Sequence, residues 1–343
     1  MATTTTAPPP VASAEAQTRP HELVWTLSMA VVASRALHLV AELGVADYLE
    51  NEPATANELA QRCGLDTDAL DRVLGLLAAH GIFEQDDGRY RHNSASSLLR
   101  SDDPRSMRAF ARLNSLPVAW QSITALDHAV RTGRPGVTTV DPSGFFAYLG
   151  KHPDEAEVFE LAMAQKARAD IADVLAAYDF SPYRMIADIG GGHGHLLDAV
   201  VHANPRVRGI LFDLPQVIDM ATPSSDRITT AAGDFFYDAL PAADLYVLME
   251  IAHDWPDREA AAILGAVRRA AEPGGTILIV EHLAPETGVD VVSQTLDVLM
   301  LAVTGGRERT PTELGALLTD AGFQPSRVIR TSGPCSVVEA VAI

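Results

Sequence analysis

The strongest constraint on the fold is the alternation of short apolar runs and helical patterns that begins after Pro182. Short runs rich in aliphatic residues predict buried parallel strands, and the patterns between them predict helices packed on the sheet. This alternation is typical of a doubly wound α/β domain. The final segment predicts two more strands around Gly333-Pro334, paired antiparallel at one edge of the sheet. The apolar runs are MIADIG, GILFDL, DLYVLME and TILIVE.

A glycine-rich loop follows the first of these runs and opens a helix, in the sequence DIGGGHGH from Asp188 to His195. Glycines at this place let the backbone approach a ligand at the carboxyl end of the first strand. A dinucleotide-binding loop would have its third glycine at position 195, where this chain has a histidine. The pattern therefore argues against a pyrophosphate ligand. A tight turn without any ligand is the alternative interpretation of the loop taken alone.

Acidic residues end the next two strands, and they are expected to meet the glycine loop at one edge of the sheet. Asp213 ends GILFDL and is the expected partner of two ribose hydroxyls. Asp234 and Phe235, which follow Gly233, are placed to read and flank an adenine. A nucleoside ligand without a pyrophosphate is typical of S-adenosylmethionine (SAM).

His253 stands just past the carboxyl end of the fourth strand, in DLYVLMEIAHDW, on the same edge as the expected cofactor site. A single histidine is more often structural than catalytic, but this position favours catalysis. Neutral imidazole, with an ordinary pKa of about 6.5, suits proton removal from a phenol-like hydroxyl with a pKa of about 10. A neighbouring carboxylate would orient the ring and stabilise the imidazolium.

The N-terminal part predicts a helical unit with a winged-helix arrangement. From His21 to Leu49, apolar residues occupy two faces of a helix, which predicts packing against a partner such as a second copy of the chain. The following segment predicts a helix capped by Thr55, a second helix opened by Thr67, and a hairpin at Asp87-Gly88.

Charge disfavours DNA binding, which is a common role of winged helices. The helix that would enter the groove carries Asp66, Asp68 and Asp71, and phosphate would repel it. The whole chain has 26 Lys and Arg against 45 Asp and Glu, a formal net charge of −19. This excess argues against nucleic acid and anionic membrane partners. A dimerisation and substrate-covering role is the preferred interpretation of this unit.

Size and composition are typical of a soluble protein with two domains. A chain of 343 residues exceeds the usual size of one domain. Cys63 and Cys335 make neither a disulfide framework nor a thiolate zinc site, and they favour a reducing, cytoplasmic setting. Charges interrupt the apolar stretches before about 18 residues, so no membrane span is expected. The expected parts are a disordered tail (1–20), a helical and winged-helix domain (21–105), a helical linker and pocket region (106–180), and the α/β domain (181–343).

Together these motifs resemble the class I SAM-dependent O-methyltransferases, the group of plant caffeate-type and bacterial natural-product enzymes. The resemblance extends over nearly the whole chain and rests on DIGGGHGHLL, FDLP, GDFF, HDWPD and GGRERTPTEL. It implies a Rossmann-like methyltransferase domain, an N-terminal dimerisation domain, and a homodimer in which one subunit helps to close the acceptor pocket of the other. It also implies SAM as the cofactor and S-adenosylhomocysteine (SAH) as the product. No metal is expected, because the sequence shows no grouped carboxylate ligands beyond those assigned to the cofactor and to His253.

The resemblance assigns roles to residues around the expected reaction centre. It makes His253 the general base, flanked by Glu281 and Glu308. Asp254 corresponds to the aspartate that follows the base in the family. The SAM contacts expected from the loop, the strand ends and the resemblance are Asp188, Gly190, Gly192, Asp213, Leu214, Gly233, Asp234, Phe235 and Met249.

The acceptor is expected to be a small aromatic or polyketide-like molecule, because apolar and aromatic residues are available to line its pocket. Met163 matches a family methionine that packs against the acceptor ring and the methyl donor. The chain departs from the family at Met249, where a lysine or arginine is usual, and at Ala167, where a serine often contacts the cofactor carboxylate. The expected acceptor residues are Trp120, Phe145, Phe146, Met163, Asp297 and Met300, with Met29, Phe110 and Val303 as further candidates.

These features predict methyl transfer from SAM to an acceptor hydroxyl in secondary metabolism, with His253 removing the hydroxyl proton. The alternative on the same fold is an N- or C-methyltransferase, or a non-methylating enzyme, but His253 with its two glutamates favours oxygen. A DNA-binding regulator is disfavoured by the acidic helix. A NAD-dependent oxidoreductase is disfavoured by His195 at the third glycine position.

Overall fold

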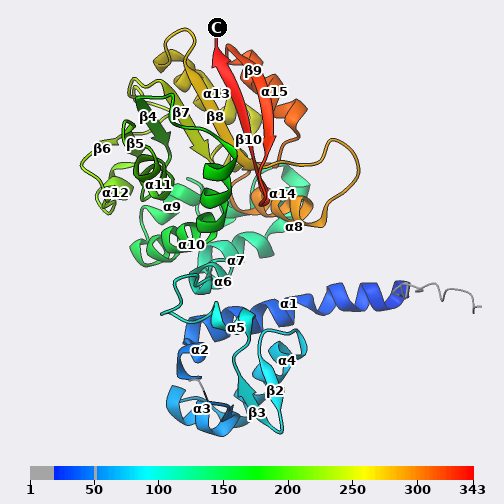
Figure 1. Cartoon of the computed structure of the whole chain (residues 1–343). Helices are drawn as coiled ribbons and strands as arrows, with labels where there is room; N and C mark the ends of the chain where they lie inside the picture. Colours follow the sequence, from blue (N-terminus) through cyan, green and yellow to red (C-terminus); the bar gives the residue numbers. More distant parts are fainter. Residues whose placement is uncertain (1–18, 50–51) are drawn as a thin grey trace, which may run out of the picture. The chain divides into compact units, whose positions relative to one another are not determined.

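The apolar runs form the centre of a seven-stranded sheet in the computed structural model, which describes residues 19–49 and 52–343 (Figure 1). The strands are β4 (Met185–Ile189), β5 (Arg208–Asp213), β6 (Ile228–Ala232), β7 (Leu245–Met249), β8 (Thr276–His282), β9 (Phe323–Arg330) and β10 (Cys335–Ala342). Their order is β6-β5-β4-β7-β8-β10-β9. Pairing is parallel from β6 to β8, whereas β10 pairs antiparallel with β8 and β9. The predicted α/β fold and the antiparallel edge pair are confirmed.

Helices cover both faces of this sheet because successive strand residues point to opposite sides. On one face, apolar side chains of α10 (Pro153–Ala177) and α11 (His195–Ala203) pack against the strands. On the other face, apolar side chains of α13 (Asp257–Ala270) and α15 (Pro311–Asp320) pack against the strands. A short helix, α12 (Pro215–Ile218), follows β5. β4 and β7 are neighbours although β5 and β6 lie between them in the chain. Open α/β sheets bind ligands at the carboxyl ends of strands where the order reverses in this way.

A second apolar cluster joins the helices that precede the sheet to a helix that comes late in the chain. The elements here are α6 (Arg108–Leu113), α7 (Pro117–Thr124), α8 (Leu126–Thr132), the 3₁₀ turn η1 (Gly136–Thr139), α9 (Phe145–Leu149) and α14 (Val291–Val303). The chain divides into two compact units, Met1–Ser96 and Ser97–Ile343. The region expected as a linker over 106–180 therefore belongs to the same unit as the sheet.

The N-terminal unit contains helices and a small sheet of order β1-β3-β2. Its elements are α1 (Pro20–Leu43), α2 (Val45–Tyr48), β1 (Ala54–Thr55), α3 (Ala56–Cys63), α4 (Thr67–Ala79), β2 (Glu84–Asp86) and β3 (Arg89–Arg91), and α5 (Ser94–Ser97) ends it at the boundary with the second unit. Thr55 and Glu58 form a capping box at the start of α3, as the sequence pattern requires. Asp87 and Gly88 have φ values of 46° and 70°, which suits a two-residue hairpin turn. The predicted tail over 1–20 falls almost wholly on residues 1–18, outside the described residues.

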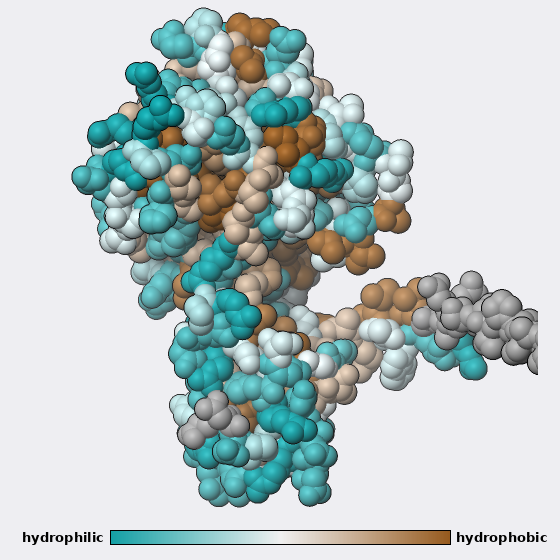
Figure 2. Space-filling view, viewed as in Figure 1, coloured by the Kyte–Doolittle hydropathy of each residue, from teal (hydrophilic) through white to brown (hydrophobic). Residues whose placement is uncertain are grey.

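The first helix is shorter than predicted and exposes much of its apolar surface. The sequence predicts one helix from His21 to Leu49, but Gly44 adopts a left-handed conformation with φ of 65° and separates α1 from α2. Trp25 and Leu27 on α1 are 70% and 68% exposed within the described chain. Contrary to expectation, α1 is long and apolar enough to cross a membrane. Figure 2 shows hydrophobic side chains gathered along this helix.

Candidate active site

The loop after β4 leaves space for a ligand because three of its glycines adopt left-handed conformations. Gly190, Gly192 and Gly194 have φ values of 71°, 57° and 81°. A Cβ added at Gly190 would lie 2.6 Å from Cδ1 of Ile251. A larger residue at this position would be strained and would clash, so the backbone remains bare at the carboxyl end of β4.

Asp213, at the end of β5, is fixed beside this loop by two backbone hydrogen bonds. The Gly192 amide donates to Oδ2 of Asp213 over 2.8 Å, and the Leu214 amide donates to Oδ1 over 2.7 Å. Burial raises the pKa of Asp213, and these two amides oppose the rise. Gly192, Asp213 and Leu214 therefore lie together, and their contact with SAM stays a prediction.

Two more carboxyl groups lie on this side of the site, close enough to Asp213 to feel its charge. Asp188 is 2% exposed, and its Oδ2 atom has no hydrogen-bond partner among the described residues. Burial, with the charge of Asp213, raises the pKa values of Asp188 and of Glu160 on α10 to about 7. Oε2 of Glu160 lies 3.9 Å from Nε2 of His193. Hydroxyl donors or positive charge on a ligand would stabilise these carboxylates, and the ribose and cationic groups of SAM fit that requirement.

The expected adenine side lies at the end of β6. The Gly233 amide donates to the carbonyl at the end of β5 over 2.9 Å, and Oδ1 of Asp234 accepts the Phe236 amide over 2.9 Å. Cε1 of Phe235 lies 3.8 Å from the position that a Cβ at Gly190 would take. An aromatic ring therefore borders the glycine loop, and the contact of Phe235 and Asp234 with adenine stays a prediction.

His253, in the 3₁₀ turn η2 (Ala252–Asp254), is surrounded by carboxylates from three parts of the chain. Nδ1 of His253 donates to Oε1 of Glu308 over 2.9 Å, and the His253 amide donates to Oε1 of Glu281 over 3.0 Å. Oδ1 of Asp254 lies 3.8 Å from Nε2 of His253. Because Nδ1 carries a proton in this arrangement, Nε2 is the nitrogen that can accept one. The residues predicted to flank His253 are thus brought together.

These carboxylates stabilise the protonated ring. Burial alone would lower the pKa of His253, but Asp254, Glu308 and Glu281 outweigh burial and raise it to about 10. Burial also raises the pKa of Asp254 to about 7. Once neutral, the His253 ring is therefore a stronger base than an ordinary imidazole and takes a proton from a phenol-like hydroxyl more readily.

Arg309 fixes the turn that carries His253, a role that the sequence analysis did not assign. Its side chain is 0% exposed. Nη1 donates to the Ala252 carbonyl over 2.7 Å, and Nη2 donates to the Trp255 carbonyl over 2.8 Å. Nε and Nη2 also donate to Oδ1 of Asp257 over 3.0 Å and 2.9 Å. The guanidinium therefore donates hydrogen bonds to the backbone on both sides of His253. In the sequence, the position of Arg309 within the motif GGRERT was the signal available for this role.

The segment just before Arg309 contacts the same turn through its backbone. The Arg307 amide donates to the His253 carbonyl over 2.8 Å. A Cβ added at Gly306 would lie 1.9 Å from that carbonyl oxygen, so only glycine permits this close approach. Oδ1 of Asp297 accepts the Glu308 amide over 2.9 Å. Asp297, predicted to bind the acceptor, therefore anchors the segment that carries Glu308.

Aromatic side chains form a continuous group from the expected acceptor side to the expected adenine side. The ring centroid of Phe146 lies 6.2 Å from that of Phe159 and 5.7 Å from that of Trp255. Phe146 stacks on Trp255 with an interplanar angle of 26°. Trp255 meets Phe235 edge to face at 6.0 Å. Trp255 was not among the predicted acceptor residues, although it lies in HDWPD beside His253. Stacked and edge-to-face rings of this kind suit a flat aromatic ligand.

The structure gathers only some of the predicted acceptor residues. Met300 is 9% exposed, Trp120 on α7 is half-buried, and Met29 lies on α1 of the N-terminal unit with 47% exposure. Their contact with an acceptor stays a prediction. Five of the predicted acceptor residues belong to the apolar cluster around α9 and α10, namely Phe110, Phe145, Phe146, Met163 and Val303.

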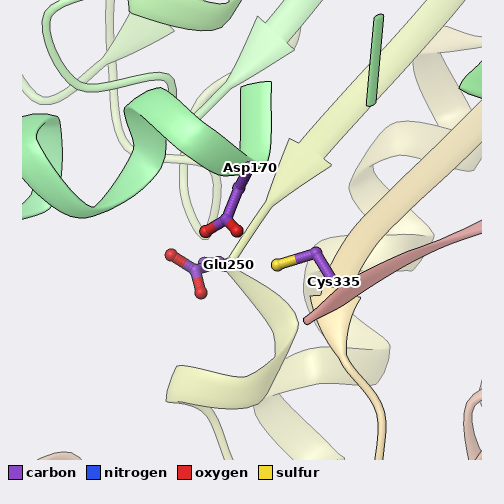
Figure 3. Close-up of side chains that lie close together, drawn as sticks. All are labelled: Asp170, Glu250 and Cys335. Atoms are coloured by element: carbon purple, nitrogen blue, oxygen red, sulfur yellow. The ribbon is translucent and has the colours of Figure 1, made fainter. Parts of the chain in front are cut away.

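A further acidic group lies near the carboxyl end of β7, contrary to the expectation that no such group exists beyond the assigned residues. One ligand atom each from Asp170, Glu250 and Cys335 lies within 4.8 Å of the other two (Figure 3). The ammonium of Lys166 forms an ion pair with Glu250 in the same place. Met249, predicted to contact SAM, packs against the apolar core between the sheet and α10. No local pattern marks this group, because its members come from distant segments.

Comparison with known proteins identifies the family. Residues 123–324 match the O-methyltransferase domain, and residues 25–102 match the O-methyltransferase dimerisation domain. The chain belongs to this O-methyltransferase family, which confirms the resemblance inferred from the motifs.

Relatives of this chain are similar over almost their full length. The phenazine O-methyltransferase PhzM of Lysobacter antibioticus is 36% identical over 90% of this chain and 92% of its own. The O-demethylpuromycin-O-methyltransferase of Streptomyces alboniger is 37% identical over 96% of this chain and 91% of its own. The crystal structure of LaPhzM has a TM-score of 0.89 at 35% identity and covers 95% of this chain and 100% of its own.

Proposed function

We propose that the protein transfers a methyl group from SAM to a hydroxyl of a small aromatic or polyketide-like natural product. The observation that carries this proposal is the position of His253, surrounded by carboxylates at the same sheet edge as the glycine loop. Its relatives include enzymes named for O-methylation of a phenazine and of demethylpuromycin. SAM supplies the methyl group on a sulfonium when it is bound.

Different residues of the chain bind SAM and remove the acceptor proton. Asp213 accepts hydrogen bonds from the ribose, and Asp234 and Phe235 contact the adenine. His253 removes the acceptor proton at Nε2 as the new bond to oxygen forms. Glu308 keeps Nδ1 protonated and, with the other carboxylates, stabilises the imidazolium that results.

The aromatic group that contains Phe146 and Trp255 positions the acceptor ring. Flat rings packed on these side chains lose water-exposed apolar area and keep a defined orientation. Alignment of the acceptor oxygen with the methyl donor is a large part of catalysis in a transfer reaction of this kind.

Product analysis tests the proposal. The purified protein is incubated with SAM and a panel of hydroxylated aromatic compounds, and the products are separated and identified by mass and NMR. We expect a methyl ether and an equal amount of SAH. Matched acceptors with the hydroxyl already methylated serve as controls and are expected to give no product. A methylated nitrogen or carbon, or binding of NAD in place of SAM, would contradict the proposal.

We also propose that the protein is a homodimer built through the N-terminal unit and works in the cytoplasm. The exposed apolar side chains of α1 support burial against a second copy, and residues 25–102 match the dimerisation domain. Burying this helix in a dimer also accounts for its hydropathy without a membrane.

Charge placed on α1 is expected to weaken the dimer. Val31 on α1 is 53% exposed, and Val31→Asp should raise the dimer dissociation constant by about 10-fold or more, because the carboxylate would be buried unpaired. Val130→Asp is the control, since Val130 on α8 is 74% exposed and lies outside the N-terminal unit. Sedimentation velocity over a concentration series measures both. A wild-type monomer at working concentration would overturn the proposed dimer.

A further inference from the structure

A partly buried ion pair near the carboxyl end of β7 has no role in the mechanism described so far. Lys166 of α10 and Glu250, just after β7, form this pair with side-chain exposures of 24% and 14%. Glu250 also belongs to the acidic group that it forms with Asp170 and Cys335 (Figure 3). Burial alone would lower the pKa of Lys166, but the charges of this group outweigh burial and raise it. The chain has only one other lysine, Lys151, whose pair with Asp141 lies at a more exposed position.

The pair lies at the sheet edge where the cofactor is expected. In the parallel pairing of β4 with β7, Asp188 lies opposite Val247. Three residues farther along each chain come Gly191 of the glycine loop and Glu250. Glu250 adopts φ of 54°, a left-handed conformation that is costly for a residue with a side chain. The strand order reverses between β4 and β7, so the pair borders the crevice that such a reversal creates.

Helix α10 connects this pair to the other side of the cofactor site. Glu160 of α10 lies near Asp213, the expected ribose ligand, and near Gly192. Lys166 follows six residues later, which corresponds to about 9 Å along the helix axis. The same helix therefore places a carboxylate at the ribose side and an ammonium at the β7 side. Asp188, with its unpartnered buried oxygen, lies on β4 between β5 and β7.

We propose that Lys166 and Glu250 bind the amino-acid end of SAM, with Lys166 holding its carboxylate and Glu250 its ammonium. This inference rests on the proposed function. An α-amino acid is a zwitterion, and a pair of opposite charges is its electrostatic complement. When the zwitterion lies against the pair, each of the four charges keeps an opposite neighbour, so no buried charge is left unpaired. The loop side holds the carboxyl groups of Asp188 and Asp213, which would repel the carboxylate of SAM.

Ligands that lack the amino-acid end separate this role from a general effect on folding. SAH carries the ribose, the adenine and the amino acid, whereas 5′-methylthioadenosine lacks the amino acid. We expect Lys166→Met to weaken SAH binding by about 10- to 100-fold, as the loss of a charge-assisted hydrogen bond predicts, with little change for methylthioadenosine. Lys166→Arg keeps the charge and should bind SAH within a few-fold of wild type. Lys151→Met is the matched control and should leave both affinities unchanged. Isothermal titration calorimetry measures each affinity without turnover.

Decarboxylated SAM, which keeps the ammonium and lacks the carboxylate, distinguishes the two partners. Lys166→Met should bind decarboxylated SAM no more weakly than wild type does, whereas Glu250→Gln should bind it more weakly. Equal weakening of SAH and methylthioadenosine by Lys166→Met, or no weakening of SAH, would overturn the inference. A wild-type protein that binds neither SAH nor methylthioadenosine would instead overturn the proposed function itself.

Discussion

Replacing His253 by glutamine is expected to lower kcat by about 10²- to 10⁴-fold, the usual contribution of a positioned general base. Glutamine keeps a polar side chain of similar reach but cannot take the acceptor proton. SAH affinity should stay at the wild-type value, because the glycine loop and Asp213 hold their positions through other contacts. Single-turnover product formation and calorimetric titration with SAH measure the two quantities. A His253→Gln protein with full turnover would remove the base from the mechanism.

The pH dependence of kcat/KM is a second measurement of the role of His253 as the base. Only the neutral ring accepts a proton, so kcat/KM should rise with pH while the imidazolium loses its proton, and the pKa of about 10 places this rise on the alkaline side. Glu308→Gln removes one cause of the raised pKa, so the rise should move to lower pH. His253→Gln should lose this rise altogether. An acceptor whose hydroxyl ionises well above pH 10 keeps its proton for the base to remove and keeps its own titration out of the measured range. A profile unchanged in both variants would contradict the assignment.

The sequence predicted the part of the site that depends on strand ends. The glycine loop, Asp213, Asp234 and His253 each follow a predicted strand, and carboxyl ends of parallel strands meet at one edge of a sheet. Glu308 lies in a loop after α14, where no local pattern places it beside β7. Only the resemblance to a family pointed to that residue.

Glu160 and Lys166 on α10 escaped prediction for a different reason. The helical pattern shows that α10 exists, but the rotation and position of a helix on a sheet are set by packing of side chains far apart in the sequence. Glu160 and Lys166 therefore read as ordinary surface charges until α10 is seen against the sheet. The acidic group of Asp170, Glu250 and Cys335 combines three distant segments, and its spacing resembles no known ligand pattern. The break at Gly44 was missed because apolar residues continue on both sides of it.

Loss of the Arg309 side chain is expected to reduce kcat by about 100-fold, the cost of displacing a catalytic group by about 1 Å. Arg309→Ala removes the bonds to the Ala252 and Trp255 carbonyls, so the turn that carries His253 is free to shift. KM for the acceptor and SAH affinity should change little. Because the guanidinium is fully buried, Arg309→Ala leaves a cavity of matching shape, and added guanidinium ion at millimolar concentration should restore part of kcat.

Two further variants separate positioning from general stability. Arg309→Lys keeps the charge but lacks the planar fork that reaches two carbonyls, so it should remain impaired and should not respond to guanidinium. Arg307→Ala is the control: that side chain is 46% exposed and pairs with Asp257 and Glu313 at the surface, so kcat should stay near wild type. A purely structural role would lower the amount of folded enzyme and leave kcat per folded site unchanged. Recovery of kcat by guanidinium in Arg309→Ala alone is the result that only a positioning role for this residue explains.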